Sequence, residues 1–376
     1  MNFDFSDDQK ALRDHVEKFL SDKCDRSLVR SILEDNNKFY AKELWQEVSS
    51  MGWTGVAIPE KYGGLGLGML ELCVIAEELG KSLAPIPFSS SIYIFSEFIK
   101  MYGNDEQKKK YLPKIASGEF IGSFAFAEKN GTPKPQNMQM EFSDGTLNGV
   151  KSPVNDGNVA DVIIVAANTD GNKNYNSLSL FIVETKQDKV KCEVLETLDP
   201  SRPSSRITFN SANGEKLGEI GAGWDMIQNI LNRAAVLFAF EQVGGSQTAL
   251  NDAKKYSLER YAFGKKIGTF QALKHKMVDM YVKIELAKSN AYYGAWALST
   301  DSSELPVAAA SARVSAIDAF HYSSKENIQI HGGVGFTWDY DCHLFYRRSK
   351  LLSLNIGSVR QWKENLISNL EKRNIV

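Results

Sequence analysis

The sequence predicts an α+β protein in which a helical region, a strand-rich region and a second helical region follow one another. Apolar residues recur at helical spacing in residues 1–118, alternate with a period of two in residues 119–223, and return to helical spacing in residues 224–376. A length of 376 residues suits two or three domains of ordinary size. We therefore expect an N-terminal helical domain (1–118), a middle β-barrel domain (119–223) and a C-terminal four-helix bundle (224–376).

The first region contains three helical patterns. Ser6 precedes the acidic Asp7 and Asp8, which is typical of a capped helix start. A second pattern runs through 70–79 and closes at Gly80, and a third covers 107–116. Between the first two patterns lies a glycine-dense loop at 57–66, where the backbone must turn tightly.

The middle region reads as short strands separated by Asp-Gly turn signals. Such spacing predicts a small antiparallel barrel or sandwich of roughly 100 residues that ends near 221–223. The expected strands are 120–126, 162–166, 178–183, 190–195 and 206–209.

The last region predicts four helices, and a bundle of such helices can hold a cofactor between its faces. Only Gly244-Gly245 interrupts the first of them. No G-x-G-x-x-G follows a strand, so a Rossmann site is not indicated. The expected helices are 225–259, 271–299, 305–330 and 358–372.

Composition excludes several classes of protein. Lys plus Arg total 44 and Asp plus Glu total 46, a near-neutral balance that argues against nucleic-acid binding. The four cysteines are too scattered for a disulfide framework, and the histidines do not recur at ligand spacing, so we expect no metal site. The first residues lack the apolar core of a signal peptide, and no long apolar run could span a membrane. We expect an intracellular, cytoplasmic protein.

Three motifs and the α–β–α order together resemble the acyl-CoA dehydrogenase family over essentially the whole chain. The motifs are Ile-Pro-Glu-Lys-Tyr-Gly-Gly-Leu-Gly at 58–66, Arg260-Tyr261-Ala262-Phe263-Gly264 with Phe270-Gln271, and Gln-Ile-His-Gly-Gly-Val-Gly-Phe at 329–336. Within the family, residues 241–245, 270–276 and 346–350 are most similar to the bacterial branch that acts on steroid and other bulky acyl-CoA thioesters.

The resemblance implies a flavoprotein oxidoreductase with FAD extended between subunits. A base removes a proton from Cα of an acyl-CoA thioester, a hydride leaves Cβ for flavin N5, and a trans-2-enoyl-CoA results. It further implies an electron-transferring flavoprotein as acceptor, and a homodimer or homotetramer as the assembly.

The anion site for the cofactor centres on Arg260, whose planar guanidinium suits phosphate oxygens. The alternative is that Arg260 only caps the C-terminal turn of its helix, where a cation is favoured. By resemblance, the residues that hold FAD are Arg260, Phe263, Gly264, Phe270, Gln271, Gln329 and Gly333, with Asn155 at the flavin ring edge.

Two stretches of the middle region depart from the family pattern. The run that usually reads Thr-Glu-Pro-Gly-x-Gly-Ser-Asp is replaced at 127–135, where most of its glycines and serines are lost. The run that usually reads Trp-Ile-Ser/Thr-Asn maps to Pro153-Val154-Asn155-Asp156, so the indole is absent. The alternative for 152–157 is a plain turn between strands.

The base also departs from the family. Isoleucine stands at 356, in Asn-Ile-Gly-Ser, where many members carry a glutamate in Tyr-Glu-Gly-Thr, and an isoleucine cannot accept a proton. We assign the base to Glu241, because burial in the apolar stretch that precedes it would favour a raised pKa. Ala234 begins this apolar stretch. Glu241 lies seven residues farther, about 10 Å along the helix axis and on the same face. The alternative is a structural glutamate paired with Arg347 or Arg348.

Two other functions remain open for this fold. One is a non-catalytic or half-site subunit of a hetero-oligomeric acyl-CoA dehydrogenase, in which a related chain contributes the base. The other is a flavin oxidase or monooxygenase.

Overall fold

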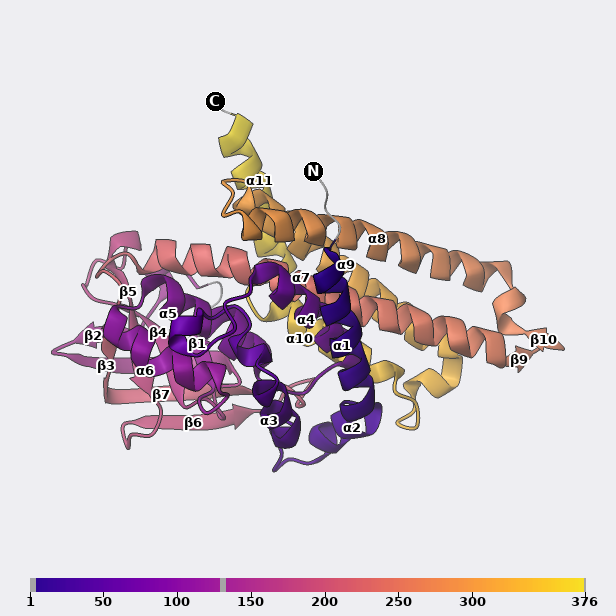
Figure 1. Cartoon of the computed structure of the whole chain (residues 1–376), viewed down its shortest axis with the longest axis horizontal. Coiled ribbons are helices and arrows are strands. Elements are labelled where there is room, and N and C mark those ends of the chain that lie inside the picture. Colours follow the sequence, from indigo (N-terminus) through magenta and orange to yellow (C-terminus); the bar gives the residue numbers. More distant parts are fainter. Residues whose placement is uncertain (1–4, 129–132, 375–376) are drawn as a thin grey trace. The chain divides into compact units, whose positions relative to one another are not determined.

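The computed structural model describes residues 5–128 and 133–374 (Figure 1). Helices come first, a sheet follows, and long helices complete the chain, so the predicted fold class is confirmed. The helices that precede the sheet are α1 (Asp7–Lys23), α2 (Arg26–Glu34), α3 (Lys42–Ser50), α4 (Met69–Ser82), α5 (Ser96–Tyr102) and α6 (Asp105–Ala116).

The start of α1 is a capping box. The Oγ of Ser6 accepts a hydrogen bond from the Gln9 backbone N–H at 3.2 Å, and the Gln9 side chain accepts one from the Ser6 N–H at 3.0 Å. Both bonds satisfy donors that the first helical turn leaves unpaired. The negative charges of Asp7 and Asp8 in that turn interact favourably with the positive end of the helix dipole. The predicted helix start is confirmed.

The middle region forms one eight-stranded sheet in the order β6-β7-β3-β2-β4-β5-β8, with β1 paired to β4. No pairing among the described residues joins β6 to β8, so the sheet is open and the expected closure into a barrel is not observed. The strands are β1 (Gly122–Ala125), β2 (Glu141–Ser143), β3 (Thr146–Asn155), β4 (Val162–Asn168), β5 (Leu178–Glu184), β6 (Val190–Leu195), β7 (Ser204–Asn213) and β8 (Glu215–Leu217).

All four helices expected after the sheet are present, and α10 is an addition to the prediction. Its Arg347-Arg348-Ser349-Lys350 run hid the helical period, yet Arg348 and Ser349 are buried. Gly244-Gly245 does not interrupt α7. Glycine is needed at 244 for close packing on α4, since a β-carbon there would lie 1.9 Å from the Glu77 carbonyl oxygen. The helices are α7 (Gly223–Glu259), α8 (Gln271–Ser299), α9 (Leu305–His331), α10 (Cys342–Leu354) and α11 (Val359–Asn374).

The chain forms two compact units. The helical unit comprises 1–29, 69–84 and 235–376, and the sheet unit comprises 30–68 and 85–234. The boundary between residues 234 and 235 lies inside α7. The domain limits at 118 and 223 remain a prediction. Every helix in the described ranges is too short or too polar to cross a membrane.

Candidate functional site

Glu241 lies near the middle of α7 in the helical unit, and its side chain is buried, with 2% of the residue exposed. Its backbone is in close contact with α4, since a β-carbon at Gly80 would lie 1.9 Å from the Glu241 carbonyl oxygen. With Gly244 against Glu77, two glycines therefore let α4 and α7 touch backbone to backbone. The position of Glu241 is set by this contact.

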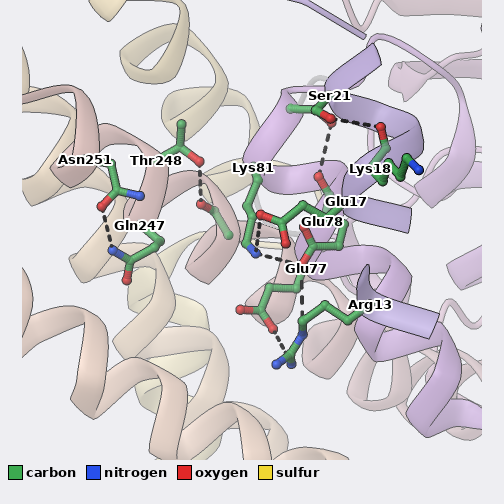
Figure 2. Close-up of polar contacts among 12 residues, drawn as sticks. Arg13, Glu17, Lys18, Ser21, Glu77, Glu78, Lys81, Gln247, Thr248 and Asn251 are labelled. Carbon is green, nitrogen blue, oxygen red and sulfur yellow. Dashed lines mark hydrogen bonds and ion pairs between the residues drawn. The ribbon is translucent and has the colours of Figure 1, made fainter. Parts of the chain in front are cut away.

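Charged side chains join α4 to α1 (Figure 2). Arg13 lies 3.3 Å from the carboxylate of Glu77 and 3.9 Å from that of Glu78, and Lys81 lies 2.7 Å from Glu78. Burial raises the pKa of Glu78 to about 7, although Lys81 opposes the shift. Arg13 and Lys81 therefore compensate part of the negative charge that Glu77 and Glu78 bring to α4.

A buried arginine of α9 also contacts α7. Arg313 donates to the Gln242 side-chain oxygen at 2.5 Å and to the Leu352 carbonyl oxygen. Burial lowers the pKa of Arg313 to about 9, while the negative charge of Glu241 acts in the opposite direction. Glu241 therefore lies within the electrostatic reach of Arg313. The sequence did not single out this arginine, because nothing in its apolar, alanine-rich surroundings marks it.

The sequence suggests Arg348 as a structural partner of Glu241, and the structure shows it at the end of α4. It donates to the carbonyl oxygens of Leu83 at 3.2 Å and Ala84 at 3.4 Å. These carbonyls follow the C-terminus of α4, where a cation is favoured. Arg348 thus fixes the end of the helix that carries Gly80.

The predicted FAD residues at 260–264 form a small hairpin between α7 and α8. β9 (Tyr261–Ala262) pairs with β10 (Lys265–Lys266), and Figure 1 shows the pair at the tip that joins the two helices. Phe263 and Gly264 have positive φ values of 53° and 77°, as a tight two-residue turn requires. Phe263 is 95% exposed.

The structure brings this hairpin and the 329–333 motif to the same end of the helical unit. The ring of His331, at the end of α9, stacks on Tyr256 of α7 at 4.1 Å. The Arg260 backbone N–H donates to the Tyr256 carbonyl at 2.9 Å, which places Arg260 one turn beyond that stack. A small core of Leu250, Ala253, Ile330 and Leu273 joins the ends of α7 and α9 to the start of α8, where Phe270 and Gln271 lie.

These residues fit a dinucleotide. Within the described ranges the guanidinium of Arg260 makes no hydrogen bond or ion pair, so its donors remain available to phosphate. A β-carbon at Gly333 would meet nothing within 4 Å, so the chain's own packing does not require glycine there. Exposed Phe263 and Phe336 offer aromatic faces. A ligand that brings anionic oxygens and rings close to the backbone would use all of these features.

Asn155 belongs to the sheet unit, where it ends β3. Its backbone carbonyl accepts from Ser123 Oγ at 2.6 Å and its side-chain oxygen accepts from Ser204 Oγ at 3.0 Å. The next residue, Asp156, accepts from Ser90 Oγ at 2.6 Å and lies 3.6 Å from Arg202. Residues 152–155 are strand and the turn starts only at Asp156. Sequence patterns missed this buried network because its members are far apart in the chain.

A second buried ion pair lies beside the replaced flavin-platform run. Lys151 of β3 is fully buried, and its Nζ lies 2.8 Å from the Glu128 carboxylate, which also accepts from the backbone N–H groups of Gln139 and Met140. Burial lowers the pKa of Lys151 to about 8, although Glu128 opposes the shift. Residues 129–132 of that run lie outside the described residues.

Ile356 lies in the short connection between α10 and α11 and is only 8% exposed. The neighbouring Gly357 has a φ of 112°, a left-handed conformation that favours glycine. Over the described ranges, no group of three or more His, Cys, Asp or Glu side chains is placed to hold a metal ion.

Comparison with known proteins gives the family. Residues 6–119 match the model of the acyl-CoA dehydrogenase N-terminal domain, and residues 221–359 match that of the C-terminal domain. The short-chain specific acyl-CoA dehydrogenase of Megasphaera elsdenii is 30% identical over 95% of this chain and 96% of its own length. The solved butyryl-CoA dehydrogenase of the same organism has a TM-score of 0.89 at 27% identity, covering 98% of this chain and all of that one.

The solved Tcur3481–Tcur3483 steroid ACAD variant has a TM-score of 0.88 over 98% of this chain and 99% of that one, at 24% identity. A likeness at that identity shows the fold alone, so the steroid-type branch stays a prediction. Two domain models and a relative that covers nearly the whole chain establish the wider group. This chain belongs to the acyl-CoA dehydrogenase family.

Proposed function

We propose that the chain binds FAD and catalyses the α,β-dehydrogenation of an acyl-CoA thioester to a trans-2-enoyl-CoA. The observation that carries the proposal is the meeting of the 260–271 and 329–333 segments at one end of the helical unit, around the Tyr256–His331 stack. In a chain of the acyl-CoA dehydrogenase family, this end presents an unpaired cation, exposed rings and glycine backbone to a ligand.

The residues proposed to hold FAD would make different kinds of contact with it. Arg260 supplies charged donors to the pyrophosphate, and Gly264 and Gly333 let the backbone come close. Phe263 and Phe270 offer ring faces, while the amides of Gln271 and Gln329 can donate and accept hydrogen bonds. Asn155 of the sheet unit is proposed for the flavin ring edge. When bound, FAD supplies the acceptor for the Cβ hydride at its N5.

Glu241 is proposed as the base that removes the Cα proton. Its burial excludes water, and the positive charge of Arg313 favours the ionised carboxylate that a base must present. Positioning comes from the contact of its backbone with Gly80 of α4.

The test is Glu241→Gln, which keeps the shape of the side chain and removes the base. The variant should retain FAD and lose flavin reduction by an acyl-CoA substrate about 10²–10⁴-fold under anaerobic conditions. Glu78→Gln, also a buried glutamate of the helical unit, is the matched control and should reduce normally. Unchanged reduction in Glu241→Gln would falsify the assignment of the base.

A half-site subunit is the second candidate, and the buried Ile356 favours it. In that case a related chain would supply the carboxylate that position 356 lacks. Purification of the chain alone decides between the two: a stable oligomer that holds one FAD per chain and is bleached by acyl-CoA speaks against an obligate partner. Flavin loading that appears only after a related chain is added would support the half-site subunit.

A homodimer or homotetramer is proposed as the assembly. Val278, Val282 and Leu286 follow one face of α8 four residues apart and are exposed, as is Tyr281. An apolar stripe of this kind marks a protein contact. An electron-transferring flavoprotein is the proposed acceptor, and turnover that needs it rather than oxygen would separate a dehydrogenase from an oxidase or monooxygenase on the same fold.

A further inference from the structure

A cavity of about 750 Å³ opens between α9, α10 and α11 of the helical unit, with Asn290 of α8 at its edge. We call it the serine groove, because Ser311, Ser315, Ser349, Ser353 and Ser358 line it. It takes no part in the proposed FAD site. His321, its residue nearest that site along α9, lies ten residues before His331, about 15 Å along the helix axis.

The serine groove contains cations without carboxylate partners. Lys350 and Lys363 both line it, and within the described ranges neither forms an ion pair. Its acidic residue, Asp318, is already neutralised by Lys283, whose Nζ lies 2.5 Å from the carboxylate. The groove is therefore positively charged.

One end of the groove is built for a charged head group. The Nζ of Lys350 lies 3.0 Å from Nδ1 of His321. Burial and the charge of Lys350 lower the pKa of His321, so the ring is neutral near pH 7 and accepts this bond. An ammonium has three donors, so Lys350 keeps two for a ligand. Ser358 accepts from the Gln361 backbone N–H, which leaves its hydroxyl hydrogen available.

Apolar side chains also line the groove. Val314 and Ile317 belong to α9, and Val359 and Leu366 belong to α11. The two helices run antiparallel, because Arg373 near the end of α11 lies 3.1 Å from Glu304 just before α9. From His321 back to Ser311 the groove follows α9 for about 15 Å. Its length and walls suit an extended hydrocarbon chain.

We propose that the serine groove is a second binding site, which takes a small amphipathic carboxylate such as a medium-chain free fatty acid. The head group binds at Lys350 beside His321, and the chain lies along α9 between the apolar walls. A neutral ligand would leave two lysines at its side without an anionic partner, and an inorganic anion would leave the apolar side chains exposed to water. The combination of both features selects the amphipathic class.

The test is calorimetric titration of the FAD-loaded chain with decanoate, with decanol and inorganic phosphate as comparison probes. Decanoate should bind, and Lys350→Met should weaken its binding about 10-fold or more, because a charge-assisted hydrogen bond is lost. Ser315→Phe, which fills the groove, should abolish it. Lys288→Met removes a partly exposed lysine of α8 that does not line the groove, so it is the matched control and should bind normally.

Each other outcome overturns the proposal. Equal affinity for decanol would remove the role of the charge, and equal affinity for phosphate would remove the role of the walls. Decanoate binding unchanged in both Lys350→Met and Ser315→Phe would place it elsewhere, for example in the acyl site. A change of oligomeric mass in Lys350→Met, with no decanoate binding to the native chain, would make the groove an interface between copies. Flavin reduction by acyl-CoA should persist in both groove variants, so the result is independent of the proposed function.

Discussion

Gly80 of α4 lies directly against the backbone carbonyl of Glu241 in α7, and a β-carbon at Gly80 would be 1.9 Å from that oxygen. Both atoms belong to helix backbones, so no side-chain rotation can relieve the clash. The glycine therefore sets the distance between the two helices, and with it the position of the proposed base relative to α4.

Gly80→Ala should destabilise the protein and displace Glu241. Overpacking of this kind costs about 1–3 kcal/mol, because the two helices must separate. Urea unfolding measures the loss, and anaerobic flavin reduction by acyl-CoA should slow in the same variant. Gly171→Ala is the control, since a β-carbon there meets nothing within 4 Å, and it should leave both measurements unchanged. A stable, fully active Gly80→Ala would show that this contact does not position Glu241.

Arg260→Met should weaken FAD binding without changing the stability of the FAD-free chain. The guanidinium has no hydrogen-bond or ion-pair partner in the described ranges, so its removal breaks no contact of the fold. Loss of a charge-assisted bond to phosphate should raise the FAD dissociation constant about 10- to 100-fold. Fluorescence titration measures the affinity and urea unfolding the stability. If Arg260 only caps α7, the result reverses: stability falls and the affinity stays.

Arg313→Met, in contrast to Arg260→Met, should lower the stability of the FAD-free chain. Arg313 is fully buried, donates to Gln242 and Leu352, and carries a positive charge that acts on Glu241, so the variant loses two buried hydrogen bonds and this charge. Breaking a buried charge arrangement on one side costs about 3–5 kcal/mol. Urea unfolding of the FAD-free chain measures it, with the exposed Arg260→Met as the matched arginine control. A loss within about 0.5 kcal/mol, as for a surface site, would contradict the assigned role.

The sequence predicted the parts of the fold that depend on local pattern. The capped start of α1 and the four long helices after the sheet follow from spacing alone. α10 was missed because buried Arg348 and Ser349 broke its apolar period, although Arg348 donates to the end of α4. β3 was missed because Gly149 and Pro153 interrupt its alternation. An open edge at β6 cannot be distinguished from a closed barrel by period, since both require the same strands.

The candidate site was predictable only where neighbours in sequence are neighbours in space. Arg260, Phe263 and Gly264 share one turn, and they lie together as expected. The charge that faces Glu241 comes from Arg313, 72 residues later in a different helix, and no spacing rule connects the two. Lys350 and Lys363 likewise line one groove only because α10 and α11 both contact α9.

Glu78 should make the stability of the protein fall as pH rises from about 4.5 to about 7. Burial holds its pKa near 7 in the folded chain, above the 4.5 of an unperturbed glutamate. The folded state therefore binds more protons than the unfolded state in this window, so the stabilisation is complete below pH 4.5 and is lost by pH 7. Glu78→Gln cannot titrate at this position. The unfolding free energy of the native protein minus that of the variant should therefore fall by up to about 3 kcal/mol across the window. A difference that is constant with pH would contradict this role.

Lys151 should act in the opposite direction and at higher pH. Its folded pKa of about 8 lies below the 10.5 of an unperturbed lysine, because burial disfavours the ammonium more than Glu128 favours it. Between these values the unfolded chain binds the extra proton, so stability rises with pH. Relative to Lys151→Met, the native protein should gain about 1 kcal/mol per pH unit between pH 8 and pH 10, measured by urea unfolding. If the stability difference between the native protein and Lys151→Met does not change with pH, the prediction is wrong. The contacts with Glu128 and the Phe126 carbonyl would then stabilise the ammonium as well as water does.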